Sequence, residues 1–210
     1  MNKFGDLSCK EFLTELASAA PAPGGGGGAA MAGALAAALA SMVANLTIGK
    51  EKFAEREPEV KELLKQAEAE RVRLLQLADD DAAVFNSFMS CYKLPKTTDE
   101  EKAARTAAIR AAAKQAATVP LNIARSSFAV LKLADRLVVS GNPGVITDGA
   151  CSGLLARAAL RCAEYNVRIN LGLTKDEAWN AQAAADLKQL LADAEALETR
   201  LLAVTDKALQ

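Results

Sequence analysis

Apolar residues recur at steps of three and four along most of this chain, the spacing of one face of an α-helix. One such stripe runs from near Pro58 to Tyr92, and another occupies the last part of the chain. The first stripe consists of Val60, Leu64, Ala67, Arg71, Leu74, Ala78, Asp81, Phe85, Phe88 and Tyr92. No segment alternates between apolar and polar residues as a half-buried strand does. The pattern therefore predicts an all-α fold built as a bundle of long helices.

Helix starts are marked by three capping boxes, each a Ser or Thr followed three residues later by Glu, at Ser8, Thr98 and Thr174. Together with the breaker residues, they divide the chain into seven helical segments. The expected segments are residues 8–19, 29–45, 58–92, 98–118, 120–141, 148–170 and the stretch after 174.

Proline and glycine set the remaining boundaries. Pro120 is expected to start or kink a helix, and the Gly-Asn-Pro-Gly sequence at residues 141–144 to form a turn. Thr147 or Asp148 then caps the next helix, which Gly172 ends. With 210 residues, 51% of them hydrophobic, residues 1–210 are expected to form a single domain.

The apolar segment 29–48 is long enough to span a membrane, but alanine contributes little to insertion. A buried central helix or a helix at a subunit interface is the preferred interpretation. The last helix carries a heptad stripe that should pack against another helix of the same subunit or of a partner. Its members are Ala183, Leu187, Leu190, Ala194, Leu197, Leu201, Val204 and Ala208.

Composition removes several classes of chemistry. The chain has no histidine, which excludes His-based triads, His-metal sites and imidazole acid–base catalysis. The formal net charge is −1 with both signs interleaved, so no basic face favours nucleic acid. Four cysteines without a CxxC pair, and an N-terminus without a signal sequence, indicate a reduced cytoplasmic chain.

A run of five glycines precedes the small-residue helix. Free N–H groups at a helix N-terminus favour anions, so this run is a candidate backbone cradle for a ligand. A plain flexible or tightly packed turn is an equal alternative, because a glycine run alone is weak evidence for a site. Neither a Rossmann nor a Walker pattern is present. The residues are Gly24, Gly25, Gly26, Gly27 and Gly28.

Two aspartates are candidate catalytic groups. Asp81 lies on an apolar stripe, and a buried carboxylate has a raised pKa that suits acid–base catalysis; exposure or pairing with a base is the alternative. Asp148 follows the turn at 141–144 and is either catalytic or an ordinary helix cap. Asp148 and Asn166 would lie about 27 Å apart on a continuous helix, so only a break, for instance at Gly153, or a second subunit packed antiparallel brings them together.

Other polar residues are candidates for ligand contact. Asn166 and Asn170 lie one turn apart on the same helix face. Lys50 and Lys96 each follow a helix end, where they are able to meet an anionic ligand or remain solvated.

Several segments, taken in order, resemble the formiminotetrahydrofolate cyclodeaminase / methenyltetrahydrofolate cyclohydrolase family. They are Pro-Ala-Pro-Gly-Gly-Gly at 21–26, Ser-Met-Val-Ala-Asn-Leu-Thr-Ile-Gly-Lys at 41–50, Asp-Ala-Ala-Val-Phe at 81–85, Leu-Pro-Lys at 94–96, Val-Pro-Leu at 119–121, Gly-Asn at 141–142 and Asn-Val-Arg-Ile-Asn at 166–170. The chain departs from the family around Thr147 and Asp148, where an asparagine is missing and a glycine is shifted.

The resemblance implies an all-helical homodimer that acts on one-carbon derivatives of tetrahydrofolate without a metal or other cofactor. It implies hydrolysis of 5,10-methenyltetrahydrofolate, with Asp81, Asp148 and Lys50 in catalytic roles and the glycine run, Lys96, Asn142, Asn166 and Asn170 binding substrate. Cyclodeamination of formiminotetrahydrofolate is the nearest alternative, and a non-catalytic folate-binding dimer is the second. No nucleic-acid or membrane partner is expected.

Overall fold

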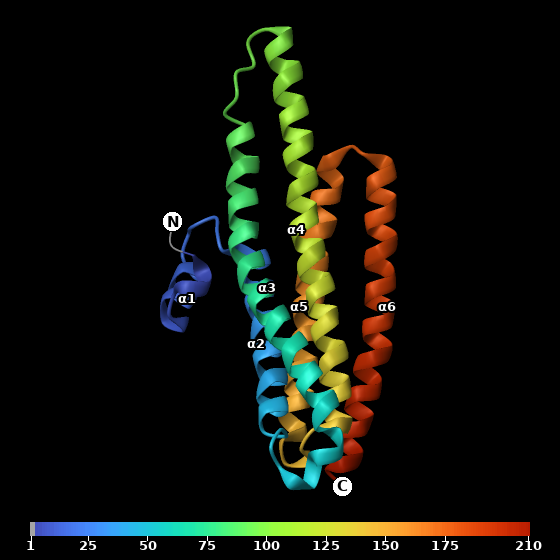
Figure 1. The fold of residues 1–210 in the computed structure, drawn as a ribbon. Coiled ribbons are helices and arrows are strands. Elements are labelled where there is room, and N and C mark those ends of the chain that lie inside the picture. The colour runs from blue at the N-terminus through green and yellow to red at the C-terminus, as the bar shows by residue number, and fades with distance from the viewer. Residues whose placement is uncertain (1–2) are drawn as a thin grey trace.

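The computed structural model describes residues 3–210, and in them the chain forms six α-helices joined by short turns (Figure 1). Short 3₁₀ segments lie at Phe4–Asp6, Glu51–Arg56 and Pro143–Val145. The helices are α1 (Cys9–Leu16), α2 (Gly24–Asn45), α3 (Glu57–Cys91), α4 (Asp99–Ser140), α5 (Ile146–Thr174) and α6 (Glu177–Ala208). The predicted all-α bundle of long helices is confirmed, although α1 ends three residues earlier than expected.

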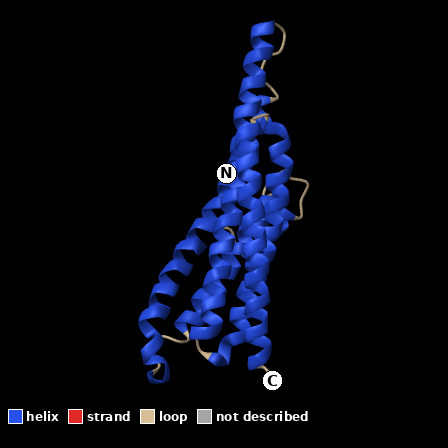
Figure 2. Ribbon diagram, turned by 90° about the vertical axis from the view of Figure 1, so that its right-hand side faces the viewer, coloured by secondary structure: helices blue, strands red, loops and turns tan. Residues whose placement is uncertain are grey.

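The long helices run up and down the bundle, and the hairpin of α3 and α4 projects beyond the turn between α5 and α6 (Figures 1 and 2). Near one end of the bundle α2 ends and α5 begins, where the backbone N–H of Asn142 donates to Oγ1 of Thr47 at 2.9 Å. Halfway along, Oγ of Ser152 donates to the carbonyl of Ala36 at 2.7 Å. The two helices are therefore antiparallel neighbours.

Small residues let these helices approach closely. A Cβ at Gly153 would lie 2.5 Å from Cδ1 of Leu201, and one at Gly149 would lie 2.9 Å from Cγ1 of Val138. Helix α5 continues without a break at Gly153, and this glycine packs against α6 instead. The heptad stripe of α6 packs within the same subunit, with Ala183, Leu187, Ala194 and Leu201 buried.

Helix α2 lies in the core, as the sequence predicts. An 18-residue window in it has a mean hydropathy of 1.7, long and apolar enough to cross a membrane, yet 61% of that window is buried inside the protein. Its remaining face exposes Leu35, Met42 and Leu46. The absence of a membrane partner stays a prediction.

The glycine run is not a loop, contrary to the sequence expectation. Helix α2 begins at Gly24 rather than at Ala29, so all five glycines form its first turns. Gly24 has a φ of 56°, a left-handed conformation that glycine adopts without strain. The reason for the difference is tertiary packing, which overrides the weak helix propensity of glycine where α2 meets α3 and α5.

The expected break at Pro120 is also absent, since α4 is a single helix from Asp99 to Ser140. Proline removes the backbone hydrogen bond to the residue four positions earlier, which leaves the carbonyl of Ala116 free. That carbonyl accepts a hydrogen bond of 2.8 Å from Nδ2 of Asn170 on α5. A side chain from a neighbouring helix thus replaces the missing donor.

The boundaries of α5 and α6 also differ from those expected from the sequence. Thr147 and Asp148 lie inside the first turn of α5 rather than capping it, and α5 continues through Gly172 to Thr174. Asp176, not Thr174, caps α6 by accepting the N–H of Trp179 at 3.1 Å.

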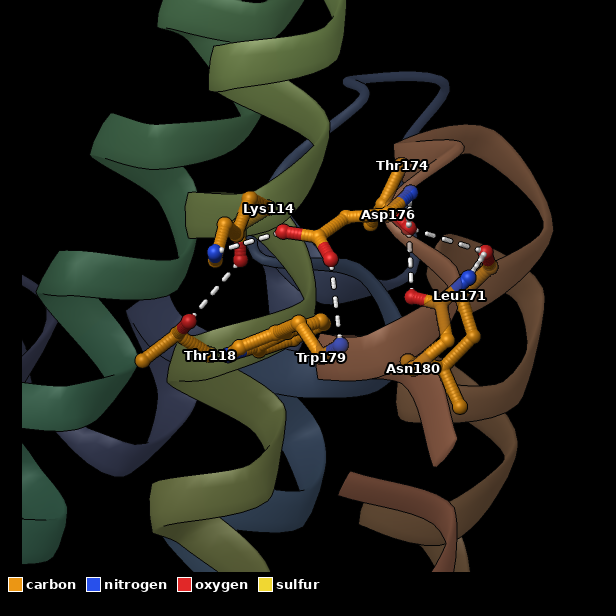
Figure 3. A network of polar contacts seen from close by, with 7 residues as sticks. All are labelled: Lys114, Thr118, Leu171, Thr174, Asp176, Trp179 and Asn180. Carbon is orange, nitrogen blue, oxygen red and sulfur yellow. Dashed lines mark hydrogen bonds and ion pairs between the residues drawn. The ribbon is translucent and has the colours of Figure 1, made fainter. Parts of the chain in front are cut away.

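The turn between α5 and α6 is fastened to α4 (Figure 3). Nζ of Lys114 lies 2.9 Å from Oδ2 of Asp176 and 5.4 Å from the centre of the Trp179 ring. Lys114 and the Trp179 N–H lower the pKa of the Asp176 carboxyl, the lysine contributing most. These contacts fix the last turns of α5, which carry Asn170 and Leu173.

Candidate functional site

Three helices line a pocket of about 340 Å³ near the start of α2. Its wall is mostly apolar and comes from α3, α4 and α5. The lining residues are Asp81, Val84, Phe85, Phe88, Ala116, Asn166, Ile169, Asn170 and Leu173. The pocket thus gathers three of the polar residues predicted from the sequence.

The glycines of α2 lie directly behind this pocket. A Cβ at Gly26 would lie 2.3 Å from Oδ2 of Asp81, and one at Gly25 would lie 3.5 Å from Nδ2 of Asn166. Only glycine at position 26 leaves the room that the Asp81 carboxylate occupies. The first intrahelical bond of α2 runs from the N–H of Gly27 to the carbonyl of Pro23 at 3.0 Å, so the N–H groups before it have no helical acceptor.

Burial raises the pKa of the Asp81 carboxyl to about 6. Its neighbours on α3 are occupied elsewhere: Oδ1 of Asp79 accepts the N–H of Phe4 at 2.6 Å, and Oδ1 of Asp80 accepts from Gln76 at 2.9 Å. Asp81 itself accepts no hydrogen bond from residues 3–210. Its carboxylate is therefore free to interact with a ligand and is basic enough to take a proton near neutral pH.

The two asparagines are held so that they present acceptors. Nδ2 of Asn166 donates to the carbonyl of Cys162 at 3.0 Å, and Nδ2 of Asn170 donates to Ala116 and to the carbonyl of Asn166. Both amide nitrogens are used on the backbone, which leaves both Oδ1 atoms available. Among the described residues, no positively charged side chain lines the pocket. A ligand that brings positive charge or N–H donors matches this arrangement.

The other predicted residues lie outside this pocket in one subunit. Lys50 and Asp148 lie near the end of the bundle where α2 ends and α5 begins. Asp148 is about 27 Å along α5 from Asn166, at about 1.5 Å per residue. Asn142 is in the same region, where Nδ2 donates to the carbonyl of Leu46 at 3.1 Å and Oδ1 accepts the N–H of Gly144. Lys96 lies in the exposed loop between α3 and α4.

Sequence reasoning did not identify the apolar wall as part of the site. Phe85 and Phe88 share the helix face of Asp81, so their spacing was a usable signal. The wall residue Ala116 on α4 contributes through its carbonyl, and Pro120 four positions later was the sign that this carbonyl lacks a partner.

Known proteins resemble this chain over most of its length. Residues 8–189 match the profile of the Formiminotransferase-cyclodeaminase family. The Methylorubrum extorquens protein named Methenyltetrahydrofolate cyclohydrolase is 45% identical over 197 residues, which are 94% of this chain and 95% of that protein. The Formimidoyltransferase-cyclodeaminase of Sus scrofa is 33% identical over 185 residues, which are 88% of this chain but only 34% of that longer protein.

A solved structure has the same fold. The crystal structure of formiminotetrahydrofolate cyclodeaminase from Thermotoga maritima superposes with a TM-score of 0.88 at 30% sequence identity and covers 98% of each chain. The matching profile extends over most of the chain, and the likeness in sequence and in fold is nearly complete in length. The chain therefore belongs to the formiminotransferase-cyclodeaminase family.

Proposed function

We propose that this protein hydrolyses 5,10-methenyltetrahydrofolate to 10-formyltetrahydrofolate. The observation that carries the proposal is the pocket in which the Asp81 carboxylate and two amide oxygens meet without any positive charge. The methenyl bridge of this substrate is a cationic amidinium, which such a pocket favours. The 45% identity to a protein named for this reaction supports the same conclusion.

Asp81 is the group we assign to acid–base catalysis. The amidinium carbon is already electrophilic, so the step that needs help is the attack of water. Asp81 accepts one proton as the water oxygen bonds to the bridging carbon, and then returns it to N5 as the bond between N5 and that carbon breaks. The remaining hydroxyl proton leaves to solvent as the carbonyl of the N10-formyl group forms. A carboxyl group with a pKa of about 6 is suited to both transfers near neutral pH. These proton transfers require no metal or other cofactor.

The second carboxylate is proposed to come from another copy of the chain. Neighbouring faces of α2 and α5 expose a broad apolar surface that includes Leu35, Met42, Leu154, Tyr165 and Ile169, the last of these 70% exposed. Residues 24–49 carry no charged side chain at all. Two copies packed antiparallel on this surface bury it and bring Asp148 and Lys50 of one copy toward Asp81 of the other. The start of the glycine run, whose N–H groups before Gly27 have no helical acceptor, then binds substrate together with Asn166 and Asn170, with Asn142 shaping the turn before Asp148.

A mixing experiment tests the shared site. The variants Asp81→Asn and Asp148→Asn are each expected to be inactive as homodimers. Unfolded together and refolded as a mixture, they should regain about one quarter of the wild-type activity, because half of the dimers are mixed and each has one intact site. No regain of activity, with mixed dimers demonstrated by mass spectrometry, contradicts a site built from two copies.

Cyclodeamination is the second candidate, because the Thermotoga maritima and Sus scrofa relatives are named for it. It requires a general acid for the departing ammonia, which Asp81 in its protonated form is able to supply. The 45% identity to the Methylorubrum extorquens protein, which is named for hydrolysis, favours hydrolysis over cyclodeamination. A non-catalytic folate-binding dimer is the third candidate.

An absorbance assay on the purified protein separates these candidates. With 5,10-methenyltetrahydrofolate the methenyl absorbance is expected to fall, and with 5-formiminotetrahydrofolate no rise is expected. A rise with the formimino substrate and no fall with the methenyl substrate establishes the deaminase instead. Tight folate binding without either change identifies a binding protein. A cytoplasmic location stays a prediction from the sequence.

A further inference from the structure

Arg105 on α4 forms no ion pair with a carboxylate among residues 3–210. Its Nη2 donates to the carbonyl of Tyr92 at 3.2 Å, and its guanidinium carbon lies 5.4 Å from the centre of the Tyr92 ring. Its Nε atom is buried without a hydrogen-bond partner. Glu101, one turn earlier, is occupied by the N–H groups of Thr97 and Thr98 at 2.7 and 3.1 Å. The guanidinium is thus held in place and still has N–H donors that make no hydrogen bond.

Aromatic rings connect this guanidinium to the pocket. Phe88 lines the pocket, and its ring lies edge-on to that of Tyr92 with 5.3 Å between their centres. Tyr92 is 43% exposed, and Met89 and Leu94 beside it are also exposed. An apolar surface therefore leads from the pocket wall along the projecting part of α3 and ends at a cation.

The proposed substrate has a tail with the same order of chemistry. Beyond its reduced pterin, tetrahydrofolate carries a benzoyl ring and then a glutamate with two carboxylates. We infer that this tail leaves the pocket along Phe88 and Tyr92 and that Arg105 binds a glutamate carboxylate. Aromatic rings attract one another in edge and offset arrangements, and the planar guanidinium matches a carboxylate with two parallel hydrogen bonds. The inference rests on the proposed function, because it takes its ligand from there.

This arrangement also gives Lys96 a role in binding the tail of the substrate. Lys96 and Lys93 are exposed in the loop that begins at Tyr92. Further glutamates added to the tail would extend toward these two lysines. Arg105 is then a residue that determines specificity for the tail and lies apart from the reacting carbon.

The test compares two substrates that differ only in the glutamate, 5,10-methenyltetrahydrofolate and 5,10-methenyltetrahydropteroate. For Arg105→Ala, KM for the folate is expected to rise by at least about tenfold, because hydrogen bonds between two charged groups are lost. Its kcat is expected to stay unchanged, because the contact is equally strong before and during reaction. KM for the pteroate is expected to equal that of the wild type.

Two further variants make the result specific. Arg110→Ala removes an exposed arginine from the same helix and should leave both KM values unchanged. Arg105→Gln retains a donor for the Tyr92 carbonyl and serves if the alanine variant folds poorly. An equal change of KM for the two substrates, or none, overturns the inference and leaves the proposed function intact. If the wild type converts neither substrate, the proposed function fails, and calorimetric binding of tetrahydrofolate and tetrahydropteroate to the same variants decides the role of Arg105.

Discussion

Replacing Asp81 with asparagine is expected to lower kcat for hydrolysis of 5,10-methenyltetrahydrofolate by at least about 100-fold. The substitution keeps the size of the side chain and removes the carboxyl group that lines the pocket among the described residues, and positioned acid–base groups contribute about 10² to 10⁴ in rate. In the wild type, kcat should rise with pH and level off above about 6, where the carboxyl group has lost its proton. Initial rates followed by methenyl absorbance between pH 5 and pH 8 measure both effects.

The neighbouring aspartate provides the matched control. Asp80→Asn removes a carboxylate one residue away that contacts Gln76 outside the pocket, and it should leave the pH profile in place. If Asp81→Asn retains more than a tenth of the wild-type kcat, Asp81 is not the acid–base group.

The Asp81→Asn variant should also be more stable than the wild type in alkaline solution. The carboxyl group ionises near pH 3.8 in the unfolded chain and near 6 in the folded one, so the folded state holds more protons between these values. Stability due to Asp81 therefore falls as pH rises through that window and stays lower above it. The amide of the variant does not titrate, so the midpoint of thermal unfolding at pH 8 should be higher for the variant, with the difference vanishing below pH 4.

Substitution of Gly26 by alanine is expected to lower kcat/KM by about 100-fold, although it leaves every catalytic residue in the chain. The added Cβ would lie 2.3 Å from Oδ2 of Asp81, a distance that atoms do not tolerate, so the carboxylate must move. Displacement of a reacting group by about 1 Å costs up to about 10² in rate. Steady-state kinetics with the methenyl substrate measure the effect.

Another glycine of the same run separates this clash from a general effect on the helix. A Cβ at Gly28 would meet only Cδ2 of Leu16 at 3.9 Å, so Gly28→Ala should keep full activity. It should also raise stability by up to about 1 kcal/mol, the helix propensity difference between the two residues. Combined with Asp81→Ser, Gly26→Ala should cause no further loss. A further loss in that background means that Gly26 acts through something other than Asp81.

The sequence was sufficient for most of the fold because helical periodicity and capping are local. The capping boxes at Ser8 and Thr98 form as expected, and the stripe of α3 faces the core at Val60, Ala67 and Leu74. The errors occurred where a contact from a distant helix decides the local structure. Asn170 satisfies the carbonyl that Pro120 leaves free, and α3 and α5 hold the glycine run in a helix.

The site was harder to predict, because residues distant in sequence form it. The stripe identified Asp81, and the one-turn spacing identified Asn166 and Asn170, yet nothing in the sequence shows that α2 and α3 bring the three together at Gly25 and Gly26. The distance between Asp148 and Asn166 follows from helix geometry alone. Because α5 is unbroken between them, the predicted separation is confirmed. The interface proposed to bring them together is formed by residues of two copies, and such an interface has no local pattern in the sequence.

A helix that opens with five glycines has an unusual energetic profile along its length. Each glycine is about 1 kcal/mol less favourable in a helix than alanine, so the first turns of α2 depend almost wholly on their neighbours for order. This end of α2 therefore unfolds locally once its contacts with α3 or α5 are lost. The backbone amides of these glycines should exchange with deuterium sooner than those farther along α2. Asp81 and Asn166 pack against these same turns, so a ligand bound in the pocket should slow that exchange. The rate of amide exchange at the glycines therefore reports whether a ligand is bound.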